Sequence, residues 1–456
     1  MSKIEETLNR QKEYFYSGRT LELSARLAAL SSLEQAVRNH EEEVIEALHL
    51  DLNKSRTEAV ITELGIFYNE VSYLRKNLRR LMKPKKVRTT LSLIPARSYV
   101  VSEPYGCVLI MSPWNYPFLL TMQPLAGALA GGNCVALKPS AYSPHTSEVI
   151  RTIVSEALNE ELVTVVLGGR QENQQLLDQP FDFIFFTGSV AVGKLVMIKA
   201  AERLTPIALE LGGKSPVIVD ETADIDLAAK RLVFGKFINA GQTCVAPDHI
   251  FVHHSVERQL VDRLIYWIEQ FYPLDEKEFI ADYPCIINQK HFERLLGLLK
   301  DQQITYGGKH NEETRQIQPT IVRNVDRSNK LMQEELFGPI FPILTYESFT
   351  DVISEIKRLP KPLALYLFST DESHMKTVEN EVSFGGGCIN DCVVQLSNHH
   401  LPFGGVGNSG VGSYHGEASF RCFTHQKSLV RKSNHLDISV RYRPYDKRKS
   451  DILTRL

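Results

Sequence analysis

The sequence has little cysteine, and the spacing of its cysteines does not suggest a disulfide framework. The chain has 456 residues and 7 cysteines, and an odd number of scattered cysteines is typical of proteins from reducing compartments. The first residues lack the apolar core of a signal peptide. We therefore expect a cytoplasmic protein that is long enough to bury its core without cross-links.

Long apolar runs and an excess of one charge are also missing. The most apolar segment, 118–130, is interrupted by Gln123 and Pro124 and is shorter than the roughly 20 residues of a membrane-spanning helix. The net charge is -2, which gives no sign of a nucleic-acid-binding protein. Two basic stretches, 75–97 and 427–455, are expected to be solvated faces or a subunit contact, and contact with a membrane surface or a polyanion is the alternative.

The order of helical and extended patterns predicts an α/β protein. Residues 1–82 have apolar positions at the three-and-four spacing of amphipathic helices. From Pro104 onward, short apolar runs closed by Gly or Pro alternate with helical stretches, as in βαβ units. A similar pattern starts again at Pro216. Two Rossmann-like parallel-sheet domains are therefore predicted, one for a coenzyme and one for catalysis.

The connecting segments look different from these two domains. Residues 89–101 are rich in Thr, Leu, Ser, Tyr and Val and carry Pro95, which favours an extended segment at a sheet edge. Residues 427–445 are also strand-like and basic, and no strand within the chain is an obvious partner for them. We expect a small β arm that serves oligomerisation, most simply in a homodimer.

These patterns suggest boundaries for the domains. The coenzyme-binding domain is expected at 1–82 and 104–210, and the catalytic domain at 211–395. Oligomerisation or bridging segments are expected at 83–103 and 396–445, and a C-terminal tail at 446–456.

The loop at residues 188–195 has the glycines and the lysine of a P-loop but lacks its last residue. A P-loop requires Ser or Thr after the lysine to hold Mg²⁺, and Leu195 carries no oxygen. Gly188 and Ser189, expected at the start of a helix, still suit an anionic phosphate. This pattern favours a dinucleotide over a hydrolysed triphosphate, although the usual G-x-G-x-x-G fingerprint is absent.

Cys244 is the candidate nucleophile. It follows the amphipathic run 227–238 and stands on a tight loop next to a helix end. A free cysteine is more often a buried core residue than a reactive one, so its role depends on partners elsewhere. A zinc site at Cys388 and Cys392 with the histidines at 399–400 is disfavoured by poor ligand spacing, and no metal site is predicted.

Seven motifs in order along the chain resemble the motif series of the aldehyde dehydrogenase superfamily. They span nearly the whole sequence, and Glu210 and Cys244 are 34 positions apart, as the base and nucleophile of that family are. The short N-terminal region and the motifs at 407–410 and 413–416 are similar to the class 3 branch, which acts on medium-chain aliphatic and aromatic aldehydes, commonly as dimers. The seven motifs lie at 113–117, 138–140, 186–189, 210–214, 241–244, 335–339 and 402–405.

The resemblance implies that an aldehyde is oxidised to the carboxylic acid with NAD(P)⁺ through a thiohemiacetal and a thioacyl enzyme. Cys244 is then the nucleophile, and a thiol suits this role because modest pKa depression gives a useful thiolate fraction. Glu210 is the base that activates the hydrolytic water. The Asn115 amide and the Cys244 N–H stabilise the oxyanion.

The resemblance also implies coenzyme and substrate contacts. Lys138 and Glu335 are expected at ribose hydroxyls, Ser189 with its neighbour Gly188 at the pyrophosphate, and Phe337 near the nicotinamide ribose. The residues expected to line the substrate pocket are Tyr116, Thr243 and His415.

The coenzyme is NAD or NADP on this reasoning. Members of the family often carry an acid after the Lys-Pro-Ser motif, where it discriminates against the 2′-phosphate of NADP. That position is Ala141 in this sequence. The absence of the acid leaves both coenzymes as expectations.

Two other functions compete with hydrolytic aldehyde oxidation. A CoA-acylating dehydrogenase would pass the thioester to CoA instead of water, and the presence of Glu210 argues against it. A catalytically silent binding protein would be expected to lose Cys244, Asn115 or Glu210, and all three are present.

Overall fold

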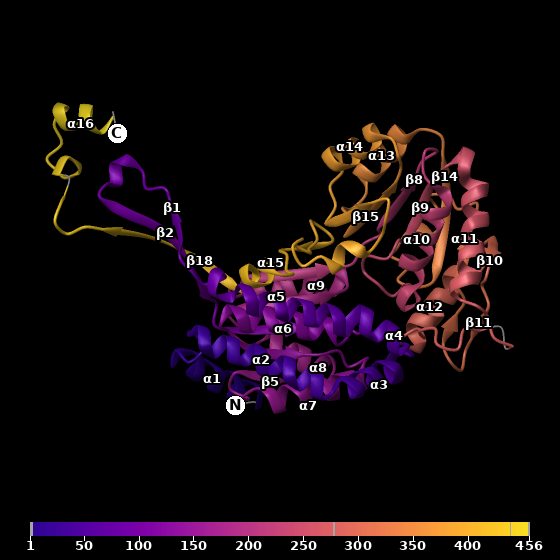
Figure 1. The fold of residues 1–456 in the computed structure, drawn as a ribbon, viewed down its shortest axis with the longest axis horizontal. Helices are drawn as coiled ribbons and strands as arrows, with labels where there is room; N and C mark the ends of the chain where they lie inside the picture. Colours follow the sequence, from indigo (N-terminus) through magenta and orange to yellow (C-terminus); the bar gives the residue numbers. More distant parts are fainter. Residues whose placement is uncertain (1–2, 277–278, 438, 455–456) are drawn as a thin grey trace.

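The computed structural model describes residues 3–276, 279–437 and 439–454. Two lobes and a protruding arm make up the molecule (Figure 1). The predicted fold class is confirmed, because each lobe contains a largely parallel sheet and the arm is a small antiparallel sheet. Among the described residues, no helix combines the length and the apolar character needed to cross a bilayer.

The sheet of the first lobe has six strands, and five of them are parallel. The five parallel strands are the short apolar runs that alternate with helices from Pro104 onward. Their order across the sheet is β17 (Gly410–Val411), β7 (Ile207–Leu211), β6 (Phe183–Gly188), β3 (Cys107–Met111), β4 (Cys134–Lys138) and β5 (Val163–Val165). The antiparallel β17 comes from the C-terminal part of the chain and pairs with β7.

Helices cover both faces of this sheet because alternate strand residues are apolar on both sides. Val108 and Ile110 belong to one apolar cluster and Leu109 to the other. The first cluster is covered by α2 (Leu23–Asn39), α3 (Glu41–Leu52), α5 (Gly65–Leu81), α6 (Leu119–Gly131) and α7 (Pro144–Ala157). The second is covered by α1 (Lys3–Tyr16), α8 (Arg170–Leu177) and α9 (Val190–Ala201).

The helical region 1–82 was predicted, but its irregular middle was not. Between α4 (Arg56–Ala59) and α5, residues Val60–Leu64 form a π-helical turn. Such turns are rare and occur mostly at functional sites. This one carries side chains toward the cavity described below.

The sheet of the second lobe has seven strands. Their order is β10 (Ile304–Tyr306), β13 (Thr320–Val322), β14 (Ile340–Tyr346), β9 (His249–His253), β8 (Pro216–Val219), β15 (Ala364–Phe368) and β16 (Gly386–Ile389). The helices of this lobe are α10 (Ile225–Phe237), α11 (Glu257–Phe271), α12 (Gln289–Leu299), α13 (Phe349–Arg358) and α14 (Glu372–Glu381), and a two-stranded ribbon joins β11 (His310–Asn311) to β12 (Gln316–Ile317).

β14 contains a proline, Pro342, which donates no ladder hydrogen bond. In the structure Pro342 is opposite Val322 of β13, and the pairing of β14 with β9 begins one residue later, at Ile343. The proline therefore lies where the strand has one neighbour only.

The arm is a three-stranded sheet in the order β1 (Lys85–Val87), β2 (Ala96–Pro104) and β18 (Thr424–Lys432). Two expectations about it were wrong. β2 is the central strand, with Pro95 just before its start, and not an edge. Its partner β18 lies within the same chain and pairs with it along nine residues. The arm extends away from both lobes and leads to α16 (Lys447–Leu453), whereas α15 (Glu417–Cys422) packs on the first lobe (Figure 1).

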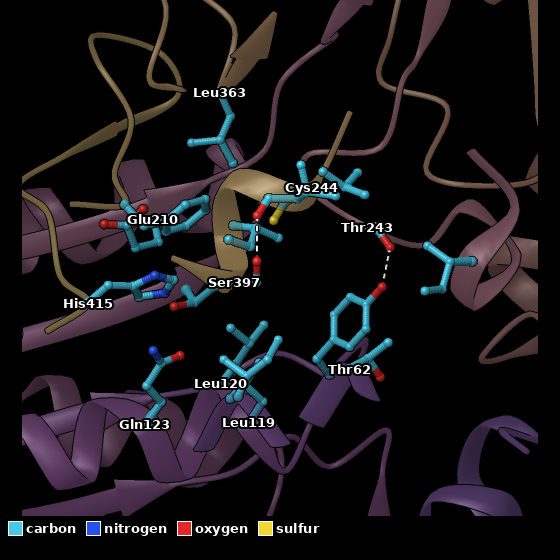
Figure 2. Close-up of a pocket in the computed structure, with 18 of the residues that line it drawn as sticks. Thr62, Leu119, Leu120, Gln123, Glu210, Thr243, Cys244, Leu363, Ser397 and His415 are labelled. Carbon is cyan, nitrogen blue, oxygen red and sulfur yellow. Dashed lines mark hydrogen bonds between the residues drawn. The ribbon is translucent and has the colours of Figure 1, made fainter. Parts of the chain in front are cut away.

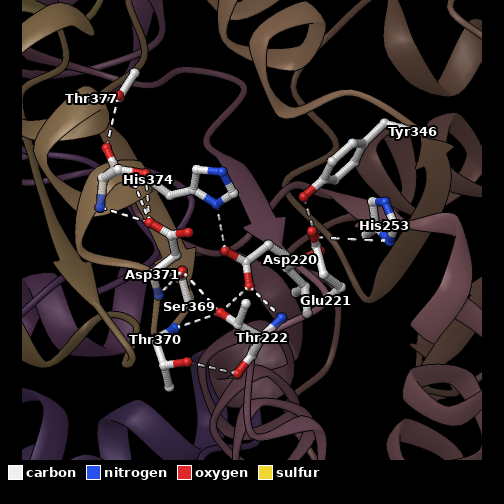
Figure 3. A network of polar contacts seen from close by, with 12 residues as sticks. Asp220, Glu221, Thr222, His253, Tyr346, Ser369, Thr370, Asp371, His374 and Thr377 are labelled. Carbon is white, nitrogen blue, oxygen red and sulfur yellow. Dashed lines mark hydrogen bonds and ion pairs between the residues drawn. The ribbon is translucent and has the colours of Figure 1, made fainter.

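A polar network closes the carboxyl-terminal edge of the second sheet (Figure 3). The buried Asp220 follows β8, accepts from the backbone N–H and hydroxyl of Thr222, and pairs with His374 Nδ1 at 2.8 Å. His374 also stacks on Phe349, with ring centroids 3.7 Å apart. These groups fix α13 and α14 to the sheet. Cys244 precedes β9 and therefore lies at the opposite edge.

Candidate active site

A cavity lies where the two lobes meet, and it contains about 1080 Å³ of empty space, its open mouth included. Its wall is mainly apolar, with a few polar groups around Cys244 and Glu210 (Figure 2). Of the residues predicted from sequence, the cavity brings together Cys244, Glu210, Tyr116, Thr243 and His415.

Cys244 is half-buried and stands between η3 (Ile238–Gly241) and β9. Burial is the main cause that raises the pKa of its thiol to about 12, and the nearby carboxyl groups of Glu335 and Glu210 add to it. Burial and these carboxyl groups therefore favour the protonated thiol. A nearby base or positive charge must favour the thiolate for Cys244 to act as a nucleophile.

Glu210 is the second chemical group of the cavity and is 2% exposed. It belongs to β7, opposite Thr187 on one side and Gly410 on the other. Neither carboxyl oxygen has a hydrogen-bond partner among the described residues. Burial raises its pKa well above that of an ordinary carboxyl, so Glu210 combines access to the cavity with unusual basicity.

Asn115 is buried beside the cavity and is not among its described lining residues. Its side-chain Nδ2 donates to the carbonyl oxygen of Gln242 at 2.9 Å, two residues before Cys244. One N–H of the amide is thus committed to the loop that carries the thiol.

Tyr116 and Thr243 share a hydrogen bond of 2.5 Å between their hydroxyls (Figure 2). The ring of Tyr116 also lies 4.1 Å from the ammonium of the buried Lys54. This fixes the position of the tyrosine on one wall. The wall thus combines an aromatic surface with a hydroxyl pair.

His415 is on the other side of Glu210, where its ring stacks on Phe403 with centroids 5.2 Å apart. Its backbone has a φ of 80°, and its N–H donates to the Ser419 hydroxyl at 2.9 Å. Burial lowers the pKa of His415 to about 3. The imidazole is therefore neutral and presents polar atoms without charge.

Lys138 ends β4 at the carboxyl edge of the first sheet, where nucleotides bind in open α/β folds. Its Nζ donates to the carbonyl oxygens of Pro139 at 2.8 Å and Gly168 at 2.7 Å. Burial lowers its pKa to about 8. Glu172 opposes this shift and closes the Gly168 turn by accepting from the N–H of Gly169.

Gly188 and Ser189 lie between β6 and α9, at the same sheet edge. The Ser189 hydroxyl caps α9 by accepting from Val192 N–H. A Cβ on Gly193 would lie 2.5 Å from Leu211, so glycine lets the first turn of the helix approach the sheet closely. The remaining N–H groups of that turn are a suitable binding surface for a phosphate.

Glu335 and Phe337 come from the second lobe, on the turn before β14. The Glu335 carboxyl lies so close to Gly212 that a Cβ there would be 2.1 Å from Oε2, and it accepts from the N–H of Gly213. Burial and Asp248 raise its pKa to about 8. Phe337, at a φ of 48°, packs edge-on against Trp114 with centroids 5.4 Å apart.

Sequence reasoning missed most of the cavity wall. Phe234 and Ile238 are one helical turn apart in the run before Cys244, which was a usable signal. The segments around residues 61–66, 119–123 and 393–397 gave none, because they meet only through the tertiary fold. The missed lining residues are Ile61, Thr62, Ile66, Leu119, Leu120, Gln123, Thr187, Leu211, Phe234, Ile238, Leu363, Val393, Val394, Leu396, Ser397, Phe403 and Tyr414.

Comparisons with known proteins agree with this geometry. Residues 2–429 match the aldehyde dehydrogenase family. The chain is 47% identical to a 4,4'-diaponeurosporen-aldehyde dehydrogenase of Staphylococcus aureus, over 98% of this chain and 97% of that protein. It is 43% identical to a dimeric NADP-preferring aldehyde dehydrogenase of the dog, over 97% of this chain and 98% of that protein.

Solved structures give the same result. The substrate-bound state of Staphylococcus aureus AldH superimposes with a TM-score of 0.97 at 46% identity, covering 100% of this chain and 99% of the other. A Mycobacterium tuberculosis aldehyde dehydrogenase complexed with NAD⁺ has a TM-score of 0.81 at 28% identity, with 91% and 86% of the two chains covered.

Proposed function

The chain belongs to the aldehyde dehydrogenase family, and we propose from this premise how its cavity oxidises an aldehyde to the carboxylic acid with NAD or NADP. The observation that carries the proposal is the shared cavity of Cys244 and Glu210, a half-buried thiol and a buried carboxyl without hydrogen-bond partners among the described residues. These two groups supply a nucleophile and a base, and the apolar wall receives the substrate.

A general base takes the thiol proton of Cys244, and Sγ attacks the aldehyde carbon while the electron pair of the C=O bond moves onto the oxygen, which gives the thiohemiacetal as its oxyanion. The backbone N–H of Cys244 and the second N–H of the Asn115 amide are assigned to the developing oxyanion, a contribution on the order of 3 kcal/mol per donor. The hydrogen bond from Asn115 to Gln242 supports this assignment because it ties the amide to the thiol loop. When NAD(P)⁺ is bound, its nicotinamide accepts the hydride that leaves the thiohemiacetal carbon.

Glu210 is assigned to the second half of the reaction. The thioacyl enzyme needs one water, which adds to the carbonyl carbon, releases the carboxylic acid and returns the thiol. A carboxylate with a strongly raised pKa is an effective acceptor for the proton of that water. Its lack of a fixed partner leaves it available for this proton.

The residues of the coenzyme face suit a dinucleotide. Lys138 at the end of β4 and Glu335 on the opposite lobe are assigned to ribose hydroxyls, and Gly188 with Ser189 at the start of α9 to the pyrophosphate. Phe337 is assigned to the nicotinamide ribose. The close approach of α9 to β7 through Gly193 supports this, because it aligns the first turn with the sheet edge.

The distribution of these residues over the two lobes supports the proposed domains. We assign residues 1–82 and 104–210 to coenzyme binding, 211–395 to catalysis, 83–103 and 396–445 to bridging or oligomerisation, and 446–456 to the tail. Residues 410–411 add a strand to the coenzyme sheet, so the bridging segment also completes the site around Glu210.

The substrate proposed is an aldehyde with an apolar chain or an aromatic ring. The apolar wall continues outward to the half-exposed Ile61, Phe234 and Val394, which are 51%, 39% and 43% exposed. A longer chain therefore keeps apolar contact up to the mouth. The Staphylococcus aureus relative is named for an aldehyde substrate, 4,4'-diaponeurosporen-aldehyde.

A panel of aldehydes tests this function through the rate of NAD(P)H formation. Between acetaldehyde and dodecanal we expect kcat/KM to rise by about fourfold per methylene until the chain reaches the mouth, since each buried methylene contributes about 0.8 kcal/mol. Benzaldehyde should be a substrate. Equal kcat/KM for acetaldehyde and dodecanal would reject the apolar pocket, and product formation only in the presence of CoA would favour the acylating alternative.

We also propose a homodimer. The exposed side of α9 and the turn after it carry Leu195, Ile198 and Leu204, which are 59%, 61% and 89% exposed. Val430 on the arm is 53% exposed. Apolar side chains gathered in this way favour contact with a second copy, and light scattering should give twice the monomer mass.

A further inference from the structure

The turn that leads to Cys244 has a backbone that must be held in place. Asn239 has φ 52° and ψ 32°, and Ala240 has φ 51° and ψ 34°. Gly241 follows with a φ of 72°. The left-handed region is unfavourable for most residues other than glycine. Two such residues in succession therefore need contacts from outside the turn.

Glu58 supplies one of these contacts from the first lobe. Its carboxyl accepts a hydrogen bond of 2.8 Å from the backbone N–H of Asn239. Glu58 belongs to α4, which lies where the N-terminal helices reach the second lobe (Figure 1). The bond thus crosses between the lobes, and it ends five residues before Cys244.

The side chain of Asn239 carries this contact to the reacting groups. Its Nδ2 donates to the carbonyl oxygens of Asn115 at 2.8 Å and Gln242 at 3.2 Å. The Asn115 amide donates to the same Gln242 carbonyl. A displacement of Asn239 would therefore disturb both Cys244 and the proposed oxyanion donor.

The charged groups around Glu58 leave it without a dedicated cation. The ammonium of Lys54 is engaged by Glu63 at 2.5 Å and by the carbonyl oxygen of Asn115 at 3.1 Å. Asp282 and Glu63 oppose the charge of Glu58, and Lys54 favours it. The rings of Tyr272 and Tyr283 line the adjoining cavity together with Glu58. Burial in this setting raises the pKa of Glu58 to about 7.

We propose that Glu58 is a positioning residue, which holds the left-handed turn 239–241 and so keeps the Cys244 thiol in its attacking position. The inference rests on the proposed function of Cys244. An ionised carboxyl accepts a backbone hydrogen bond more strongly than a neutral one. The hold on the turn therefore strengthens as pH rises through about 7, and it weakens when Glu58 is protonated.

The experiment compares Glu58→Ala and Glu58→Gln with the wild type in the full-length protein. Two rates are measured per active site: kcat for aldehyde oxidation, with sites counted by the NAD(P)H burst, and alkylation of Cys244 by iodoacetamide, mapped by peptide mass. Glu46→Gln on α3, which replaces an exposed carboxylate of the N-terminal helices, serves as the control. It should match the wild type.

For Glu58→Ala we expect both rates to fall at least tenfold, with less than a twofold change in the KM for aldehyde. For Glu58→Gln the ratio of wild-type to variant alkylation rates should be near one at pH 6 and should grow as pH rises through 7. Thiol ionisation is common to both proteins and cancels in that ratio. A glycine tolerates the left-handed region, so adding Ala240→Gly to Glu58→Ala should recover at least threefold of the alkylation rate.

The proposal is overturned if both Glu58 variants stay within twofold of the wild type at every pH. It is also overturned if Glu58→Ala lowers only the melting temperature or the number of active sites, or if Ala240→Gly gives no recovery. The alkylation rate needs no aldehyde, so a wild type that fails to oxidise aldehydes would reject the proposed function and leave this test intact.

Discussion

Two carboxyl groups flank Cys244, the buried Glu210 and the half-buried Glu335, and their surroundings differ. Glu210 on β7 faces the cavity, and neither of its oxygens has a hydrogen-bond partner among the described residues. Glu335 on the second lobe lies against Gly212 and accepts from the N–H of Gly213. Burial raises the pKa of both. One carboxyl is therefore left free to exchange a proton, and the other is fixed in space.

The difference separates chemistry from binding. A base must gain and lose a proton during each turnover, so a permanent partner would oppose its work. A group that holds a ribose hydroxyl must instead keep one orientation, which a backbone N–H provides. Burial alone does not distinguish these roles, since it acts on both groups. The hydrogen-bond partners of the two carboxyl groups distinguish these roles.

The largest effect is expected from removing the Cys244 thiol, which both carboxyl groups flank. Cys244→Ala should abolish aldehyde oxidation, at least a hundredfold below wild type, because no other nucleophile of the described cavity can form the thioester. Coenzyme binding and the melting temperature should be nearly unchanged, since Cys244 is half-buried and in no disulfide. NAD(P)H formation and thermal unfolding are measured, with Cys388→Ala as the control. Turnover above a hundredth of wild type would reject the nucleophile assignment.

The second-largest effect is expected from replacing Glu210, and it distinguishes the two carboxyl groups directly. Glu210→Gln should slow thioester hydrolysis by about 10² to 10⁴, because the amide cannot accept a proton from water. A burst of at most one NAD(P)H per site should precede a slow steady state, with the acyl mass retained on the Cys244 peptide. If Glu210 also deprotonates the thiol, the burst itself will be slower.

Glu335→Gln is the matched variant for this measurement. It should raise the KM for the coenzyme and show no acyl adduct. Wild-type turnover of Glu210→Gln without CoA would move the base assignment to another group, and an adduct in Glu335→Gln would point to that residue.

Some elements around this site could be predicted from the sequence and others could not, for physical reasons. Strands such as Cys107–Met111 and helices such as Phe349–Arg358 follow from apolar runs and from helical periodicity. The π-helical turn Val60–Leu64 was not predicted. It depends on Glu63, which accepts from the first N–H groups of α6 at 2.9 and 3.0 Å. Contacts of that kind leave no periodic trace in the sequence.

The roles of site residues were predicted through motifs, and their environments were not. The motifs give the residue types at Glu210 and Glu335, each of which is a glutamate followed by leucine. Nothing in the sequence tells which one has a hydrogen-bond partner, because Gly213 and Glu335 are 122 positions apart. The amide of Asn115 is a similar case, since its partner Gln242 comes from the other lobe.

A moderate effect on kcat/KM for NADP⁺ is expected from a negative charge at the coenzyme-binding face. Ala141 is exposed and leaves no negative charge where an acid would repel a 2′-phosphate. We expect NADP⁺ and NAD⁺ to be used at comparable kcat/KM. Ala141→Glu should lower kcat/KM for NADP⁺ by about tenfold or more through like-charge repulsion, with less effect on NAD⁺. Ala141→Gln, of similar size and without charge, separates repulsion from bulk. A thousandfold preference of the wild type for NAD⁺ would show that another residue discriminates.

The smallest expected effect is on stability and tests the fixed carboxyl. The pKa of Glu335 is about 8 in the folded protein, against about 4.3 for an unperturbed glutamate. Between these values the folded state holds a proton that the unfolded state has lost, so the contribution of Glu335 to stability falls as pH rises from about 4 to 8. Glutamine keeps the shape and never ionises. Glu335→Gln should therefore raise the melting temperature by a few degrees at pH 9 and leave it nearly unchanged at pH 4.5. Calorimetry without coenzyme measures this difference. An equal shift at both pH values would mean that the carboxyl is not desolvated in the folded state, and the contrast with Glu210 would then rest on hydrogen bonding alone.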